Sequence, residues 1–223
     1  MSEPEDIEAG EPVEGPIEAE GGPEEPTEEE IRRRDVALGQ VVTYGDPVLR
    51  SKASEIREFS PALRQEADEM ISIMRDAMGV GLAATQLGAL RRILVFQAGP
   101  DATPSALVNP VVEWRSDELA TAAEGCLSLP RIIVDVERPL YVRVSGADTS
   151  GAPVLIEASG LEARVLQHEI DHLDGVLILD RTERDQRKGA MRALREGTSF
   201  SPFEPGDEDE SAEAEPQAAH EAG

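Results

Sequence analysis

Residues 161–175 repeat their apolar positions at the spacing of a helix. The residues that share one stripe, at i, i+4, i+7 and i+11, are Leu161, Val165, His168 and His172. Gly175 follows as a stop signal. The pattern predicts a helix over 161–175 that carries two histidines into an apolar setting, where an unligated charged pair would be costly to bury.

Two further helices are predicted, one on each side of this one. Ser60 and Pro61 suit the N-cap and the first helical position. The apolar face that follows is interpreted as ordinary core packing and comprises Leu63, Ala67, Met70, Ile71, Met74 and Met78. Near-helical spacing of basic residues predicts a helix over 181–195, with Arg181, Arg184, Arg187, Lys188, Arg192 and Arg195.

Short runs rich in Ile, Leu and Val predict strands between these helices. They cover residues 92–97, 106–114, 132–137, 140–145 and 154–158. We expect irregular chain or a short strand over 31–43, and brief extended segments over 124–130 and 176–179. The order of elements lacks repeated strand–helix alternation. It therefore predicts an α+β fold with largely antiparallel sheets packed around the central helix, followed by a C-terminal helix.

Charge divides the chain into three parts. Residues 1–30 hold thirteen Asp and Glu and no Lys or Arg, and residues 203–223 hold eight and none. Of the 46 acidic residues, 25 therefore remain within residues 31–202, beside all 21 basic residues. Both ends are also poor in large apolar residues, so we expect disordered acidic tails around a single domain over 31–202.

The compartment can be inferred only from coarse features. Cys126 is the single cysteine, so no disulfide can form within the chain, which fits a reducing compartment. No basic segment followed by an apolar run opens the sequence, and no run of about eighteen apolar residues occurs. We expect a cytoplasmic protein that does not enter a membrane.

Residues 168–172 read His-Glu-Ile-Asp-His. On a helix, His168 and His172 lie one above the other and can bind one divalent ion. Glu169 can then act as the general base on water at that ion. The alternative interpretation is two surface histidines on an amphipathic helix.

A catalytic metal usually takes three protein ligands and an open position. The candidates for the third ligand are Cys126 and a downstream carboxylate, Glu183 or Glu196; His220, in the acidic tail, is a poor one. Both glutamates lie among basic residues of an exposed-looking helix, so cysteine with two histidines is the better set. An inert buried Cys126 is the remaining alternative.

Three segments now resemble the signature motifs of one enzyme family. Residues 79–86 (Gly-Val-Gly-Leu-Ala-Ala-Thr-Gln), 124–128 (Glu-Gly-Cys-Leu-Ser) and 167–172 (Gln-His-Glu-Ile-Asp-His) resemble those of peptide deformylases, in the family's order. Residues 44–50 resemble the family's opening segment, and the resemblance covers roughly 35–182. Ile178 stands where many members carry an aromatic residue.

The resemblance implies removal of the formyl group from the N-terminal formylmethionine of new polypeptides. It implies Fe²⁺ as the metal, with Zn²⁺, Ni²⁺ or Co²⁺ as possible occupants, and 31–202 as the catalytic domain. It also implies a role for each matching residue: Cys126, His168 and His172 as metal ligands, Glu169 as general acid and base, and Gln86 and the backbone N–H of Leu127 as donors to the oxyanion.

Substrate and partners follow from the same segments. The glycines around Val80, with Gly81 and Gly125 as substrate-binding candidates, permit a peptide to lie alongside backbone as an added strand. Val80, Leu161 and Val165 are candidates for a methionine pocket or for plain core packing. The implied partners are nascent formylated polypeptides and, through the basic helix 181–195, the ribosome, although that helix could instead pair with the acidic tail.

Two rival functions remain open on the residues alone. A zinc endopeptidase uses the same His-Glu-x-x-His helix but takes a downstream glutamate or histidine as third ligand. A non-enzymatic metal-binding or ribosome-associated module would not need Glu169.

Overall fold

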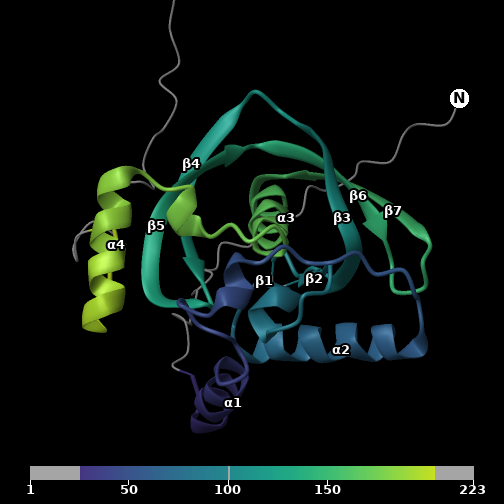
Figure 1. Cartoon of the computed structure of the whole chain (residues 1–223), viewed down its shortest axis with the longest axis horizontal. Coiled ribbons are helices and arrows are strands. Elements are labelled where there is room, and N and C mark those ends of the chain that lie inside the picture. Colours follow the sequence, from purple (N-terminus) through teal and green to yellow (C-terminus); the bar gives the residue numbers. More distant parts are fainter. Residues whose placement is uncertain (1–25, 100, 204–223) are drawn as a thin grey trace, which may run out of the picture.

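The structure, a computed structural model, describes residues 26–99 and 101–203. Helix α3 (Gly160–Leu173) lies at its centre, with antiparallel sheets on both sides (Figure 1). Within the described ranges the strands form a five-stranded sheet in the order β1-β2-β3-β6-β7 and a two-stranded sheet of β4 and β5. The predicted α+β fold around a central helix is confirmed, and α3 ends two residues before the expected 175.

Except for its first strand, which was not predicted, the larger sheet follows apolar runs that the sequence indicated. Its strands are β1 (Gly81–Ala83), β2 (Ile93–Phe96), β3 (Ser105–Arg115), β6 (Tyr141–Ala147) and β7 (Pro153–Ser159). β1 stands at one edge, because it pairs with β2 and with no other strand in the described order. This free edge adjoins the glycine-rich segment 79–81, so backbone there remains open to a peptide.

The smaller sheet is a hairpin of β4 (Leu119–Cys126) and β5 (Leu129–Pro139). The sequence pattern missed residues 119–123, which are small or exposed and carry no alternation of apolar and polar positions. It also placed Pro130 at the end of an extended segment, whereas Pro130 lies inside β5. The register is irregular between Gly125 and Cys126, which leaves Pro130 out of the ladder with β4.

A helix, α1 (Glu28–Leu38), stands where irregular chain or a short strand was expected. Thr27 and Glu30 form a capping box: the Glu30 N–H donates to Thr27 Oγ1 at 3.3 Å, and the Thr27 N–H donates to Glu30 Oε2 at 2.8 Å. This reciprocal cap stabilises a helix start. The predicted tail boundary at residue 30 is therefore wrong, because residues 28–30 are helical. The remainder of both predicted tails, 1–25 and 204–223, lies outside the described residues.

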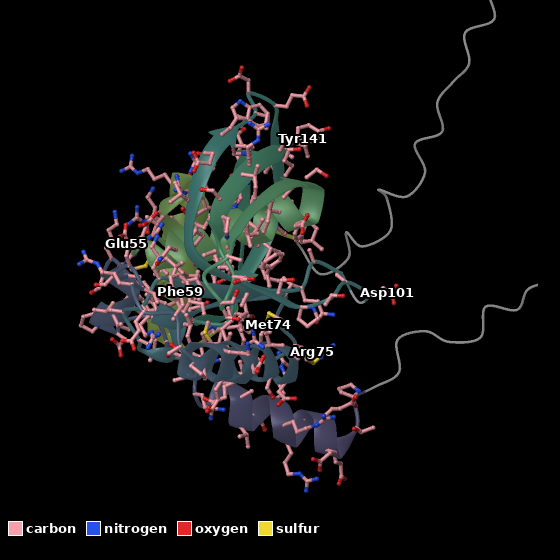
Figure 2. The ribbon with its side chains drawn as sticks, turned by 90° about the vertical axis from the view of Figure 1, so that its right-hand side faces the viewer. Glu55, Phe59, Met74, Arg75, Asp101 and Tyr141 are labelled. Carbon is pink, nitrogen blue, oxygen red and sulfur yellow. The ribbon has the colours of Figure 1, made fainter. Side chains whose placement is uncertain are left out.

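Helix α2 (Pro61–Asp76) buries the predicted methionine face against the larger sheet. Met74 is fully buried, while its neighbour Arg75 points outward and donates to Gln97 Oε1 at 3.1 Å (both α2 residues are labelled in Figure 2). Met78, expected on the buried face, is 68% exposed. It lies beyond the end of α2 with φ of +59°, so the helical spacing no longer governs it.

The C-terminal part wraps the outside of the hairpin. A short 3₁₀ helix, η3 (Ile178–Asp180), replaces the expected extended run, and α4 (Arg184–Glu196) follows against β5 (Figure 1). Small residues of α4, Ala190 and Ala193, pack on the β5 core. After α4 the Phe200 N–H donates to the Arg131 carbonyl at 3.0 Å, so residue 200 pairs with the outer edge of β5. No helix among the described residues is long and apolar enough to cross a membrane.

Candidate metal centre and active-site cleft

The two histidines and the cysteine meet between α3 and the end of β4. Helical spacing puts His168 and His172 one turn apart, with ring centroids 5.0 Å from each other. Cys126 is the last residue of β4, and its Sγ lies 3.2 Å from His172 Nε2. The three ligand atoms all lie within 4.8 Å of one another. The structure thus brings together the three residues that the sequence proposed as ligands.

The donor set fits a divalent transition metal. One thiolate and two imidazoles are typical of a catalytic site with an open fourth position. Neither of the alternative carboxylates, Glu183 and Glu196, belongs to this cluster of the described residues, and His220 lies outside them. His172 Nδ1 and Glu169 Oε2 are buried without a hydrogen-bond partner in the described structure. Unpaired buried polar atoms of this kind are costly unless something polar binds near them.

Glu124 fixes the orientation of His168. Its Oε2 lies 2.9 Å from His168 Nδ1, so the other ring nitrogen faces the cluster. Arg138 donates to both oxygens of Glu124, at 2.6 and 2.9 Å. Burial by itself raises the pKa of Glu124. The hydrogen bonds from His168 and Arg138 outweigh this effect and lower the pKa to about 2. Glu124 therefore stays ionised and holds the imidazole in one orientation.

The pKa values of the two histidines are shifted in opposite directions by their different surroundings. Burial disfavours the charged form of His168, yet its hydrogen bonds to Cys126 and Glu124 raise the pKa well above the usual value. Burial and the neighbouring His168 lower the pKa of His172 well below the usual value. The site therefore favours a neutral His172, the form in which imidazole binds metal.

Glu169 is buried beside the cluster and against the backbone of Gly81. Burial raises the pKa of its carboxyl group to about 7, although the positive charges of His168 and Arg138 oppose the rise. A carboxyl group with a pKa near 7 can both accept and return a proton at neutral pH. The position that the motif gave to the general base is thus chemically suited to that task.

Gln86 offers its amide N–H₂ to the same space. Its Oε1 accepts from the Ala83 N–H at 2.9 Å, which leaves Nε2 on the side of Cys126, 3.8 Å from Sγ. Nε2 also lies 3.4 Å from Ser128 Oγ. Leu127 lies in the tight turn between β4 and β5 and lines the same cleft. Both predicted oxyanion donors are therefore next to the cluster.

The cluster opens into a cleft of about 700 Å³. The predicted substrate residues Val80, Gly81 and Gly125 line it, as do Leu161, which is half exposed, and Val165, which is buried. The wall also includes residues of α1 that the sequence interpretation missed, namely Arg34, Asp35 and Leu38. The capping box of Thr27 and Glu30 is the signal that would have revealed this helix.

Replacing Gly81 by alanine is expected to disable the site. A Cβ atom at Gly81 would lie 2.8 Å from Cγ and Cδ of Glu169, so the carboxyl group must move. Misplacing a catalytic group by about 1 Å can cost on the order of 100-fold in rate. Turnover by Gly81→Ala should fall by that factor. Gly39→Ala, whose Cβ meets no atom closer than 3.4 Å, is the control, and equal turnover in both variants would contradict the prediction.

Comparison with known proteins agrees with the motifs. The family model described as polypeptide deformylase matches residues 38–188. A peptide deformylase from Parafrankia sp. is 45% identical over 163 residues, which cover 73% of this chain and 86% of that protein. Peptide deformylase 1 of Corynebacterium glutamicum is 44% identical over 168 residues, which cover 74% and 99%.

Solved structures agree as well. A peptide deformylase from Synechococcus elongatus in complex with actinonin is 39% identical with a TM-score of 0.66, over 71% of this chain and 88% of that one. Peptide deformylase 1B of Arabidopsis thaliana in complex with an inhibitor is 36% identical with a TM-score of 0.68, over 70% and 88%. The chain therefore belongs to the polypeptide deformylase family, and it is a hydrolase that removes the formyl group from the N-terminal methionine of new polypeptides.

Proposed function

We propose that deformylation takes place at the cluster of Cys126, His168 and His172, with Glu169 transferring protons and Gln86 stabilising the oxyanion. One observation carries this proposal. The three ligand atoms converge within 4.8 Å beside a buried glutamate whose Oε2 has no partner among the described residues. A divalent ion, water and a formyl carbonyl are the groups that such a site accommodates.

A divalent ion held by Cys126, His168 and His172 supplies the acidity that makes water a nucleophile near neutral pH. Glu169 accepts the proton of the attacking water and passes it to the leaving amine. The formyl oxygen becomes negative, and Gln86 Nε2 and the Leu127 N–H donate to it. A preorganised donor of this kind contributes about 3 kcal/mol to transition-state stabilisation. Formate and a free amino terminus are the products.

The donor set narrows the choice of metal. Mixed thiolate and imidazole ligands suit Fe²⁺, Zn²⁺, Ni²⁺ and Co²⁺ better than the hard ions Mg²⁺ and Ca²⁺. We propose Fe²⁺ as the native metal, with the other three as substitutes. Metal analysis of protein purified without oxygen from its native host tests this, and a stoichiometric zinc content without iron would reject it.

The cleft suits an extended peptide that begins with methionine. β1 stands at the sheet edge, so a peptide can add as a strand beside Gly81. Val80, Leu161 and Val165 provide apolar wall close to His168, which fits a methionine side chain. Such substrates are nascent polypeptides, and we accordingly place the enzyme in the cytoplasm, where these polypeptides are made.

Formate release from formyl-Met-Ala-Ser tests the function directly. The iron-loaded protein, purified without oxygen, should release formate and leave Met-Ala-Ser intact. The endopeptidase alternative is not favoured, because such an enzyme needs a carboxylate or a histidine as third ligand. In the described structure the residue beside the two histidines is Cys126. Cleavage of an internal peptide bond without formate release would favour the endopeptidase function over deformylation.

The ribosome is a further proposed partner, through α4. Helix α4 lies against β5 (Figure 1), and Ala190 and Ala193 pack there. Its basic residues Arg187, Lys188 and Arg192 are exposed. Clustered basic residues neutralise the phosphates of RNA. Reversing the charges of Arg187, Lys188 and Arg192 should reduce co-sedimentation with ribosomes. Reversing three basic residues of other elements, Arg32, Arg64 and Arg143, is the charge-matched control, and co-sedimentation that α4 reversal leaves unchanged would reject the proposal.

A further inference from the structure

Arg164 lies partly buried beside the metal cluster although none of the three motifs contains it. It lies on α3 one turn before His168, and its side chain is 14% exposed. Its Nη1 donates to Glu124 Oε1 at 2.6 Å and to the Val136 carbonyl at 2.9 Å. Its Nη2 donates to the Ala120 carbonyl at 2.6 Å. One guanidinium group thus connects the central helix to both strands of the hairpin.

The metal ligands come from these same elements. Cys126 ends β4, whereas His168 and His172 belong to α3. The distance between the thiol and the imidazoles therefore depends on how the hairpin sits against the helix. A clamp between α3 and the hairpin fixes that distance before any metal binds, which is the preorganisation that a tight site requires.

Arg164 also acts on the carboxylate that orients His168. Glu124 Oε1 accepts from both Arg164 and Arg138, while its Oε2 faces His168 Nδ1. Arg138 reaches Glu124 from β5 and is itself held by Asp171, at 2.8 Å. The two arginines thus hold one carboxylate from the helix side and from the strand side. Loss of Arg164 leaves Glu124 held by Arg138 alone and weakens the restraint on the imidazole.

We propose that Arg164 is a positioning residue of the deformylase, which sets the spacing between Cys126 and the two histidines and fixes Glu124 against His168. The inference rests on the proposed function of the cluster as the metal site. It assigns Arg164 no contact with the reacting atoms. Residues that hold a metal ligand in place typically contribute 10- to 100-fold to metal affinity or activity.

The planar fork of arginine is essential to this role. Its two terminal nitrogens reach acceptors on two strands at once, whereas the single ammonium of lysine cannot match that geometry. Arg164→Lys keeps the charge and the bond to Glu124 but loses at least one carbonyl. Arg164→Met loses all three bonds and keeps most of the side-chain volume. The two variants therefore separate the charge from the clamp.

Cobalt substitution reports on the site independently of turnover. Co²⁺ bound by a thiolate and two imidazoles has visible absorption bands that depend on ligand number and geometry. We expect Arg164→Met to bind Co²⁺ 10- to 100-fold more weakly in chelator competition, with altered bands, and to lose a similar factor in kcat. Arg164→Lys should fall between Arg164→Met and the parent in Co²⁺ affinity and in kcat.

Arg143→Met is the matched control. Arg143 donates to Glu157 Oε1, and both side chains are exposed on the surface of the larger sheet. It should leave the Co²⁺ spectrum, its affinity and kcat unchanged. If Arg164→Met lowers only the unfolding temperature and keeps the parent's Co²⁺ spectrum and affinity, Arg164 is structural and the proposal is wrong. If Arg164→Met does not fold, the Co²⁺ spectrum and affinity of Arg164→Lys decide.

The function and the inference fail separately. A parent protein that releases no formate from formyl-Met-Ala-Ser rejects the proposed function, yet its Co²⁺ affinity and spectrum still show whether Arg164 positions the ligands. A parent that is active beside an Arg164→Met variant with unchanged Co²⁺ binding and kcat rejects the positioning role alone.

Discussion

Glu169→Ala is expected to reduce formate release by 100- to 10,000-fold while the metal stays bound. The range is what proton transfer by a positioned side chain contributes. Glu169 suits that role because its carboxyl group is buried beside the ligands and burial raises its pKa to about 7. Alanine removes the base and leaves Cys126, His168 and His172 in place. The measurement is formate release, with metal content determined on the same samples.

Unfolding does not account for such a loss. A carboxyl group whose pKa is raised by burial costs folding free energy when it ionises. In the metal-free protein near pH 8, Glu169→Ala and Glu169→Gln should therefore unfold at a temperature no lower than the parent. Glu162→Ala, which removes an acid from the first turn of the same helix, should keep full activity. Retention of more than a tenth of the parent rate by both Glu169 variants would mean that another group moves the proton.

Local patterns were sufficient for the part of the site that lies within single elements. His168, Glu169 and His172 share one helix, so their spacing alone fixes their relative positions. The third ligand had to be chosen among Cys126, Glu183 and Glu196, because sequence spacing does not fix the position of β4 relative to α3. The structure favours Cys126, because its Sγ lies 3.2 Å from His172 Nε2.

Tertiary contacts account for what the sequence could not show. Glu124, Arg138 and Arg164 lie on three elements, and no periodicity relates them. β4 was missed over 119–123 because these residues show no alternation of apolar and polar side chains. Their strand conformation is stabilised by pairing with β5. α1 was missed because its sequence is mostly charged and exposed and its first turn continues the acidic run, although Thr27 and Glu30 form a capping box at its start. Strand and helix patterns therefore gave the fold, while the residues that support the ligands needed the assembled structure.

Cys126→Ala is expected to abolish stable metal binding and, with it, activity. The thiolate is one of three donors that converge within 4.8 Å, and alanine leaves two imidazoles. The loss of affinity should exceed the 10- to 100-fold that follows from removing a residue that merely supports a ligand. Metal content after desalting and the visible spectrum of the Co²⁺ form are the measurements, and bands from thiolate ligation should disappear. Cys126→Ser keeps the volume but replaces the sulfur, so it should lose the same bands.

This variant also decides between the two ways of using a His-Glu-x-x-His helix. An endopeptidase with a carboxylate as third ligand does not need Cys126, so its metal would survive the substitution. Glu169→Ala is the complementary control, because it should keep the metal and lose only the rate. A Cys126→Ala protein that retains stoichiometric metal and turnover would return the third-ligand position to Glu183 or Glu196. Since neither belongs to the cluster in the described structure, that result would also require the chain from η3 onward to rearrange toward His168 and His172.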